Sequence, residues 1–257
     1  MLIYFFITKG NVIYTAGEDS RVLSTSYPDF TFLNYISRNQ MPVQSIELNS
    51  DSSLMAVASL EDEIKIISLN ENNKVKTLKG HEGGVIAVAF DPKGKYIASA
   101  GRDGNIKIWN LSEEKETMTL KNMIPKEIIK GIIDLEDGKT SPILYKMQWN
   151  SEGKYLIIPG GSKGVFLIER EKWIVRRTVK DEKMECVYMI AYSNKNHMIV
   201  AADTKNQCFM FDTETSFAGI QKIGEMEDQI TNLTWSPHDS LLIIVRNKSF
   251  TDNFILE

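Results

Sequence analysis

GHEGGVIAVAFDPKGKYIASAGRDGNIKIWN, residues 80–110, is the stretch that decides the fold. It contains three short runs rich in β-branched, aromatic and small apolar residues: VIAVAF, YIASA and IKIW. The segments DPKGK and GRDG separate these runs, and their Asp, Pro and Gly residues favour tight turns. The stretch therefore predicts at least three antiparallel strands joined by hairpin turns.

The first part of this pattern recurs along the chain as an apolar triplet followed by a turn and a second apolar run. The triplets end at Phe6, Leu48, Phe90, Trp149, Tyr192 and Trp235. Six positions after each of them stand Val12, Leu54, Tyr96, Tyr155, Met198 and Leu241. The period is about 42 residues, which is typical of a four-stranded propeller blade, with one longer interval after Phe90. Such a blade cannot bury both faces alone, so neighbouring blades must stack.

We therefore expect an all-β fold, a single β-propeller domain over residues 1–257 with about six recognisable blades, the first and last of them incomplete. The repeats are expected near residues 1–40, 41–82, 83–122, 141–183, 184–227 and 228–257. An insert over residues 112–140 carries apolar side chains at Ile128, Ile129, Ile132 and Ile133, a spacing that fits one or two helical turns or an added strand. The insert either forms a binding surface or packs as a loop without a partner.

Composition excludes several classes of protein. Lys plus Arg is 30 and Asp plus Glu is 34, so the net charge of -4 argues against a strongly basic nucleic-acid binder. Two cysteines exclude a disulfide scaffold and a thiolate zinc site, and favour a reducing compartment. Residues 1–7 are apolar but lack a basic flank and are too short for a signal or a membrane span. We expect a soluble, non-secreted protein without a membrane partner.

The reactive side chains do not form a catalytic or metal-binding pattern. His81, His197 and His238 show no i, i+4 pair, so no metal site is expected. Cys186 and Cys208 are both placed in predicted strands, where a thiol behaves as a small apolar group. No serine has a GxSxG context. We expect no enzyme activity, no cofactor and no small-molecule substrate.

Two glycine-containing segments invite a phosphate-binding interpretation. GKT at residues 138–140 lacks the required glycine five positions earlier, where Ile133 stands, and the phosphate-loop hypothesis is rejected. PGGSKG at residues 159–164 occupies the place of the second hairpin turn of its repeat. There glycine supplies a positive φ, which most residues adopt only with strain.

The stretch over residues 80–110 resembles the WD-repeat family. In that family a GH histidine, a strand serine, a turn aspartate and a tryptophan form a buried hydrogen-bonded tetrad, and the resemblance implies His81, Ser99, Asp103 and Trp109 for these roles. Asn110 replaces the aspartate that usually follows the tryptophan. The other repeats have Ile67, Ile168 and Phe211 in place of the tryptophan, and the chain has no second GH. Those blades are expected to depend on packing.

A closer resemblance extends over nearly the whole chain. The order of the repeats, the long insert, GVFLIEREKW at residues 164–173 and ITNLTWSPHD at residues 230–239 resemble the amino-terminal WD domain of a replication-fork adaptor family. This is the family of the acidic nucleoplasmic DNA-binding protein and of the yeast chromosome transmission fidelity protein. By this resemblance the chain begins inside the family's domain, without its first repeat, and stops before a second, trimerising propeller.

The resemblance implies a non-enzymatic interaction platform in the nucleus that links the replicative helicase assembly to DNA polymerase alpha. DNA or chromatin is a further candidate partner. The candidate contact residues are Arg170, Lys172, Trp173, Arg176 and Arg177. For the charged residues a solvated strand edge is the simpler interpretation, because acidic residues alternate with them. For Trp173 the simpler interpretation is that its ring caps the edge of a blade. The alternatives are a WD scaffold of a signalling or ubiquitin-ligase pathway, and a propeller hydrolase.

Overall fold

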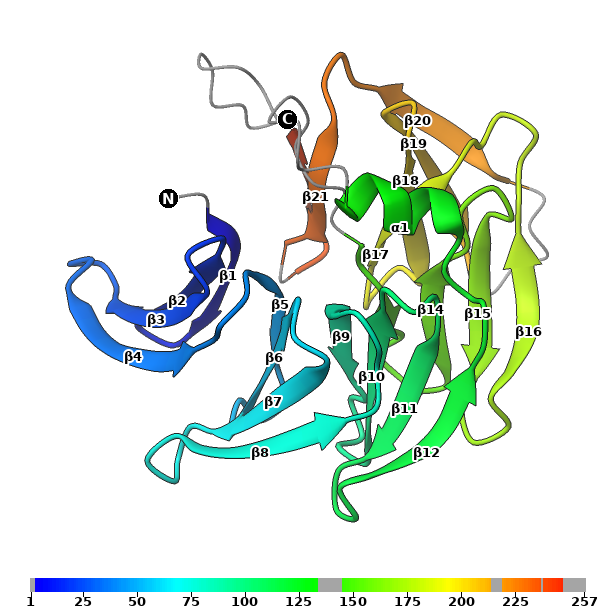
Figure 1. Ribbon diagram of the computed structural model, residues 1–257. Coiled ribbons are helices and arrows are strands. Elements are labelled where there is room, and N and C mark those ends of the chain that lie inside the picture. Colours follow the sequence, from blue (N-terminus) through cyan, green and yellow to red (C-terminus); the bar gives the residue numbers. More distant parts are fainter. Residues whose placement is uncertain (1–2, 134–144, 214–218, 237, 247–257) are drawn as a thin grey trace. The chain divides into compact units, whose positions relative to one another are not determined.

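The fold consists almost entirely of antiparallel β-sheets. The computed structural model describes residues 3–133, 145–213, 219–236 and 238–246, with the backbone alone given for residues 3–6 and 131–133. In these residues the strands form five four-stranded sheets and one two-stranded sheet (Figure 1). The prediction of an all-β fold with about six blade-like sheets is therefore confirmed. The chain divides into two compact units, Met1–Asn122 and Met123–Glu257, which we describe in turn.

The first unit contains three sheets, each with its strands in chain order. The first sheet consists of β1 (Ile3–Lys9), β2 (Val12–Gly17), β3 (Arg21–Ser26) and β4 (Phe32–Arg38). The second consists of β5 (Val43–Leu48), β6 (Leu54–Ser59), β7 (Glu63–Ser68) and β8 (Lys74–Lys79). The third consists of β9 (Val85–Phe90), β10 (Tyr96–Gly101), β11 (Ile106–Asn110) and β12 (Lys115–Leu120).

Side chains from facing sheets form the core of the first unit. Ala56, Ala58 and Ile66 of the second sheet pack with Val88 and Phe90 of the third. Every residue of β9, β10 and β11 is buried, as expected for the inner strands of a sheet covered on both faces. Full burial stabilises each large aliphatic side chain by about 1.5–3 kcal/mol, and this packing holds the blades together.

The first sheet corrects one expectation. It holds four strands, so the prediction of an incomplete first repeat is wrong. β1 continues three residues beyond the landmark Phe6 to Lys9, and a two-residue turn at Gly10 and Asn11 leads into β2. Gly10 has a φ of 56°, which this tight turn requires. The last sheet, by contrast, has two strands in the part of the chain that the structure describes.

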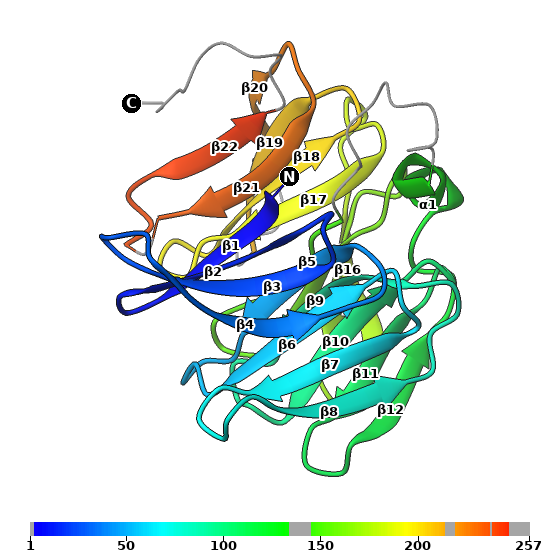
Figure 2. The ribbon, with the colours of Figure 1, turned by 60° about the vertical axis from the view of Figure 1, so that its left-hand side comes forward.

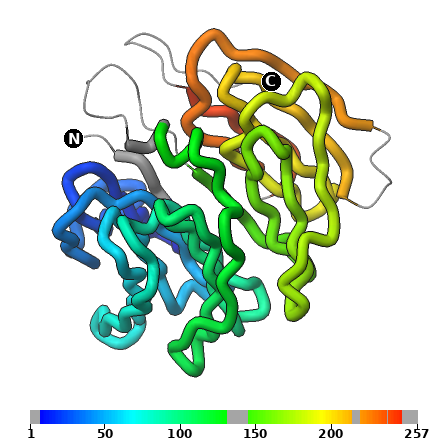
Figure 3. The backbone as a smooth tube through the Cα atoms, turned by 45° about the vertical axis from the view of Figure 1, so that its right-hand side comes forward, coloured from blue at the N-terminus to red at the C-terminus, as the bar shows by residue number. Residues whose placement is uncertain are grey.

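The second unit begins with the helix α1 (Lys126–Ile133) and contains three sheets. Figure 3 traces the course of its backbone, coloured from green to red. The fourth sheet consists of β13 (Gln148–Trp149), β14 (Tyr155–Pro159), β15 (Val165–Glu169) and β16 (Ile174–Val179). The fifth consists of β17 (Val187–Tyr192), β18 (Met198–Asp203), β19 (Gln207–Asp212) and β20 (Gln221–Glu225). The sixth pairs β21 (Ile230–Trp235) with β22 (Leu242–Arg246). Ile157, Val165, Ile190, Ile199 and Phe209 belong to one core cluster shared by the fourth and fifth sheets.

The insert is shorter than expected. Residues 115–120 form β12, the outer strand of the third sheet, because they continue the hairpin from β11 with Trp109 opposite Glu116. Of the two conformations allowed for the apolar spacing after Pro125, the structure shows the helix, with Ile128 fully buried. The rejected phosphate-loop motif at residues 138–140 lies outside the described residues. Within the described residues, no helix is both long and apolar enough to cross a bilayer.

The predicted turn at residues 159–164 joins β14 to β15. Gly161 and Gly164 have φ values of 61° and 89°. A Cβ atom at Gly164 would lie 2.0 Å from the carbonyl oxygen of Val179, so no other residue fits there without backbone movement. The interpretation of these glycines as turn residues is confirmed.

Candidate functional site

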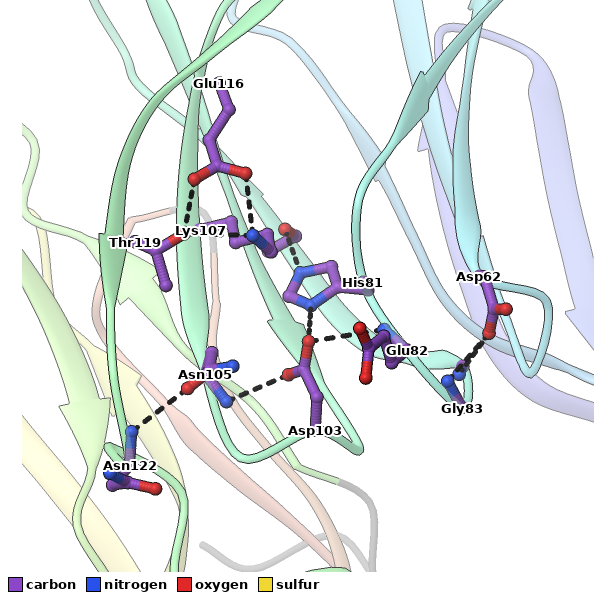
Figure 4. A network of polar contacts seen from close by, with 12 residues as sticks. Asp62, His81, Glu82, Gly83, Asp103, Asn105, Lys107, Glu116, Thr119 and Asn122 are labelled. Carbon is purple, nitrogen blue, oxygen red and sulfur yellow. Dashed lines mark hydrogen bonds and ion pairs between the residues drawn. The ribbon is translucent and has the colours of Figure 1, made fainter.

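The third sheet brings His81, Ser99, Asp103 and Trp109 together from four different places. His81 precedes β9, Ser99 lies in β10, Asp103 lies in the turn after β10, and Trp109 lies in β11. His81 Nδ1 is 2.9 Å from Asp103 Oδ2, and His81 Nε2 is 2.7 Å from Ser99 Oγ (Figure 4). The indole Nε1 of Trp109 donates to Ser99 Oγ at 2.8 Å. The four side chains thus form one continuous hydrogen-bonded row.

The partners dictate the protonation of His81. Because the indole N–H can only donate and an ionised carboxylate can only accept, the consistent assignment places the imidazole proton on Nδ1, toward Asp103. Nε2 then accepts from the Ser99 hydroxyl. Burial lowers the pKa of His81 below its ordinary value, against the opposing effect of Asp103. The row is therefore built around a neutral imidazole.

The carboxylate of Asp103 has donors on three sides. Burial acts to raise its pKa, but the backbone N–H of Asn105, the imidazole of His81 and the N–H of Glu82 hold that pKa below its ordinary value. Each donor stabilises the ionised form. Asp103 thereby fixes the turn after β10 and the segment that leads into β9.

Two glycines leave room for this row. A Cβ atom at Gly101 would lie 2.2 Å from His81 Nδ1 and 2.6 Å from Asp103 Oδ1. Gly80 has a φ of 152°, and a Cβ there would lie 3.2 Å from the Trp109 ring. Gly80 of the GH pair and Gly101, the first glycine of GRDG, are thus required by the packing of the row.

A second polar network lies beside the first. Lys107 is a buried residue, and its Nζ donates to Glu116 Oε2 at 2.6 Å and to Thr119 Oγ1 at 2.9 Å (Figure 4). Asn110, which stands where the family has aspartate, accepts from the backbone N–H groups of Ser112 and Glu113 through its Oδ1. An amide oxygen is sufficient for this turn, because the interaction needs an acceptor and no charge.

The positions equivalent to Trp109 in the other sheets are apolar. Trp109 lies opposite Ile97, and the same register places Ile67 opposite Met55, Ile168 opposite Leu156, and Phe211 opposite Ile199. Ile67, Ile168 and Phe211 are fully buried. These three blades use packing at the place where the third sheet uses a hydrogen bond.

The sequence did not single out two further aspartates that, like Asp103, accept backbone hydrogen bonds and hold segments of the chain together. Asp203, at the end of β18, is fully buried and accepts from the backbone N–H groups of Glu185, Lys205 and Gln207. Asp62 accepts from the N–H groups of Gly83 and Gly84, and so connects the second sheet to the start of the third. The available signal was an aspartate at a strand end before a polar turn, which favours local backbone hydrogen bonds.

The basic cluster lies around the hairpin from β15 to β16 and is interleaved with carboxylates. Lys172 Nζ is 2.8 Å from Glu169 Oε1, and Arg170 Nη1 is 2.9 Å from Glu171 Oε1. Arg176 Nε lies 4.0 Å from Glu169 Oε2. The guanidinium of Arg177 donates to the carbonyl oxygen of Thr213 at 3.1 Å. These charges are largely balanced, and a contact with a partner or DNA remains a prediction for them.

Trp173 is the exception within the cluster. It occupies the turn with a φ of 53°, its side chain is only 7% exposed, and its ring centroid lies 6.2 Å from that of Trp149. The indole therefore packs against the end of the fourth sheet, which is the capping role that the sequence favoured over an aromatic contact with a partner.

The remaining reactive side chains are dispersed. His197 Nδ1 lies 3.0 Å from the hydroxyl of Tyr192, and His238 lies in an exposed turn. Cys208 lies in β19, where burial raises the pKa of its thiol to about 12. Cys186 precedes β17, so its prediction as a strand residue is wrong. Within the described ranges, no three His, Cys, Asp or Glu side chains lie together as metal ligands would.

Four-stranded antiparallel sheets repeated in series, one of them fastened by a His–Ser–Asp–Trp row, define a WD40-repeat protein. Over residues 3–249 the chain matches the family described as the first WD40 domain of WDHD1, and it belongs to that family.

Known relatives agree with this family. The chain is 26% identical over 238 residues to WD repeat and HMG-box DNA-binding protein 1 of Xenopus laevis and 22% identical over 236 residues to the protein of that name in Homo sapiens. Each alignment covers 91% of this chain but 20% of the relative. Protein HIR1 of Gibberella zeae is 27% identical over 138 residues, which is 51% of this chain and 13% of that protein.

Proposed function

We propose that this domain is a non-enzymatic protein-interaction platform of a nuclear replication adaptor, which links the replicative helicase to DNA polymerase alpha. The observation that supports the proposal is the family match over residues 3–249, whose relatives are named as DNA-binding proteins. Because the chain covers only 20% of those relatives, the activity of the whole protein is part of the proposal.

The architecture supports a platform. Short loops on rigid sheets hold side chains in fixed positions, an arrangement that suits docking of partner segments. The polar groups of His81, Ser99, Asp103 and Trp109 form hydrogen bonds with one another, and these hydrogen bonds stabilise the third sheet. We further propose that the six sheets form a single propeller domain over residues 1–257.

The test is affinity purification of the chain, tagged at its own gene, from cells in DNA synthesis and from cells arrested before it. Recovery of helicase and polymerase alpha subunits that is enriched during synthesis would support the proposal. Recovery of ubiquitin-ligase or signalling components in their place would overturn it and favour a scaffold of another pathway.

The contact prediction has its own variant. Arg176→Glu with Arg177→Glu reverses two exposed charges on β16, and the matched control is Lys74→Glu with Lys115→Glu on two other outer strands. If β16 contacts a partner, only the first pair reduces recovery of replication subunits. Equal recovery by both pairs excludes these arginines. Fluorescence anisotropy with duplex and single-stranded DNA shows whether the lost contact was to DNA.

The alternative of a propeller hydrolase is tested with the same purified chain. Ester, phosphoester and peptide substrates should be turned over no faster than by a sample of the heat-denatured chain. Turnover that a single substitution abolishes would contradict the non-enzymatic proposal.

A further inference from the structure

The fourth and fifth sheets enclose a small cleft beside their shared core. Its volume is about 280 Å³. The described residues that line it are Asn150, Glu152, Lys154, Tyr155, Arg177, Tyr192, His197 and Thr213. The first five lie in the fourth sheet and its turns, and the last three lie in the fifth. Figure 2 shows the strands of the fifth sheet, β17 to β20, in yellow to orange.

Contacts between the two sheets fix the walls of this cleft. Arg177 Nη1 donates to the carbonyl oxygen of Thr213 at 3.1 Å. The backbone N–H of Tyr192 donates to Gln148 Oε1 at 3.1 Å. Tyr155 and Tyr192 also pack with the core cluster that the two sheets share. The cleft is thus formed within one compact unit, between sheets held together by a common core.

The strand register directs Arg177 toward the cleft. In the pairing of β16 with β15, Arg177 lies opposite Leu167. Residues directly opposite each other in an antiparallel pair point to the same side of the sheet. Leu167 belongs to the core that the fourth sheet shares with the fifth, so Arg177 is on the same side. Of the five contact residues that the sequence suggested, Arg177 is the one that lines the cleft.

Lys154 supplies a second cation at the end of the turn from β13 to β14. Asn150 Oδ1 accepts from the backbone N–H groups of Lys154 and Tyr155, both at 2.8 Å, and so fixes this turn. Lys154 Nζ lies 5.2 Å from the centre of the Tyr155 ring, and it forms no ion pair in the part of the chain that the structure describes. An ammonium group beside an aromatic ring retains N–H donors for an anion.

The fifth sheet contributes a polar wall whose groups bind one another. Thr213 Oγ1 donates to the carbonyl oxygen of His197 at 2.8 Å. The hydroxyl of Tyr192 lies 3.0 Å from His197 Nδ1. His197 has a φ of 53°, and these contacts hold it in the turn after β17. This wall therefore shapes the cleft, and the charged donors come from the fourth sheet.

The charges of the lining favour an anion. Lys154 and Arg177 are cations, the hydroxyl of Tyr155 is a further donor, and Glu152, in an exposed turn, is the one carboxylate among the described lining residues. A phosphorylated side chain carries a charge of about −1.5 to −2 at neutral pH and three acceptor oxygens, which matches two cations. The volume is slightly below the roughly 300–1,000 Å³ of small-molecule sites and suits a single side-chain group.

We infer that this cleft binds a phosphorylated serine or threonine of a partner protein. Lys154 and Arg177 donate to the phosphoryl oxygens, and the hydroxyl of Tyr155 is a third donor. The inference deepens the proposed function and rests on it in one respect, because it takes the domain to be a protein-interaction platform. It does not depend on the partner being a replication protein.

Two other anions fit less well. Nucleic acid requires a row of cations, but this cleft has two, and the carboxylate of Glu152 repels a second phosphate. An aspartate or glutamate of a partner brings one negative charge to two cations. The phosphorylated side chain is therefore favoured.

The test uses the whole chain and an array of peptides of about ten residues, each with phosphoserine or phosphothreonine at its centre and varied residues around it. The peptide that binds most tightly is then labelled with fluorescein, and its affinity is measured by anisotropy. We expect it to bind at least about tenfold more tightly than the same peptide with an unmodified hydroxyl or with aspartate at the centre, because hydrogen bonds to charged groups are the stronger ones.

The variants separate the cleft from the rest of the fourth sheet. Lys154→Ala with Arg177→Ala should weaken binding about tenfold or more. Lys163→Ala with Arg176→Ala removes an exposed lysine and an exposed arginine outside the cleft lining, and this matched control should leave binding unchanged. Lys154→Arg with Arg177→Lys keeps both charges and should retain most of the binding, which also shows that the sheet tolerates changes at these positions.

The contrary outcomes are distinct. Equal binding of the phosphorylated and unmodified peptides, or an equal loss in the two alanine pairs, would overturn the inference. So would tighter binding of ATP or of a single-stranded oligonucleotide than of any peptide in the array. If no peptide binds while replication subunits are still recovered, the inference fails and the proposed function stands. If a phosphopeptide binds as expected and those subunits are not recovered, the inference stands and the proposed function fails.

Discussion

His81 Nδ1 lies 2.9 Å from Asp103 Oδ2, although the two residues are 22 positions apart in the chain. This contact joins the segment before β9 to the turn between β10 and β11. It therefore connects three neighbouring strands at one end of the sheet. The imidazole also forms a hydrogen bond with Ser99, and Ser99 accepts one from Trp109. One chain of hydrogen bonds therefore connects the segment before β9 with β10, with the turn after it and with β11. Four predictions follow from it and from its counterparts.

Ser99→Ala should destabilise the domain by about 1–3 kcal/mol. The substitution leaves the indole N–H of Trp109 and the Nε2 of His81 buried without a partner. Denaturant unfolding followed by tryptophan fluorescence measures the loss. Ser50→Ala, at an exposed serine in the turn between β5 and β6, is the matched control and should change stability by less than about 0.5 kcal/mol. Equal stability of both variants would show that the row contributes little.

Gly101→Ala should destabilise the domain by about 2–4 kcal/mol, because the new methyl group would overlap His81 and Asp103. Gly94→Ala is the control. It has a φ of 72° but no atom within 4 Å of the new Cβ, so backbone strain alone should cost about 1–2 kcal/mol. A larger loss for Gly94→Ala than for Gly101→Ala would contradict the crowding argument.

Stability should fall as the pH decreases below about 6.5. The pKa of His81 is lowered by burial, so the unfolded chain binds the imidazole proton more readily than the folded chain. The contribution of a neutral His81 to the free energy of unfolding is fully present above the pKa that the imidazole has in the unfolded chain. It is lost as the pH falls toward the lower pKa of the folded chain, by at most about 1.4 kcal/mol per pH unit. The lowered pKa of Asp103 adds a loss in the same direction at more acidic pH.

The check is the urea midpoint between pH 7.5 and 5.5. His81→Gln keeps a polar side chain but removes the titrating group, so its stability should depend less on pH over this range. His238→Gln, at an exposed turn, should retain the wild-type dependence. A wild-type midpoint that does not change with pH would be inconsistent with a neutral His81.

Asp203→Ala should destabilise the domain by about 2–4 kcal/mol. Asp203 is fully buried, and its removal leaves three backbone N–H groups without their acceptor. Asp181→Ala is the control, since Asp181 accepts one N–H at an exposed turn. Thermal unfolding compares the two variants, and equal melting temperatures would refute the importance assigned to Asp203.

Much of the third sheet was predictable, because each of its signals is local. The turns DPKGK and GRDG bound short runs of β-branched, aromatic and small apolar residues, and the landmarks Leu48, Phe90, Tyr192 and Trp235 each end a first strand in the structure. The exception at Phe6 arises because the two-residue turn at Gly10 allows a longer hairpin. Hairpin register follows from turn length, which is written in a few neighbouring residues.

The failures concern residues whose partners are distant in the sequence. The sequence left two roles open for Trp173, a contact with a partner or the capping of a blade edge, and only the ring of Trp149, on another strand, shows that Trp173 is covered. In the sequence Asp203 does not differ from the other carboxylates of the turns. Only the structure shows that the backbone N–H of Glu185, 18 positions earlier, donates to it. Nothing near Tyr35 in the sequence reveals that Arg21 lies beside its ring.

The sequence by itself determined the repeat, the strands and turns within each sheet, and the family, since these depend on short apolar runs and on turn residues a few positions apart. Only the tertiary structure decided which polar groups are satisfied, which tryptophan is covered and which side chains line a common cleft. The physical reason is that burial and hydrogen bonding depend on the neighbours a residue acquires in space. Those neighbours come from strands whose spacing in the chain carries no local signal.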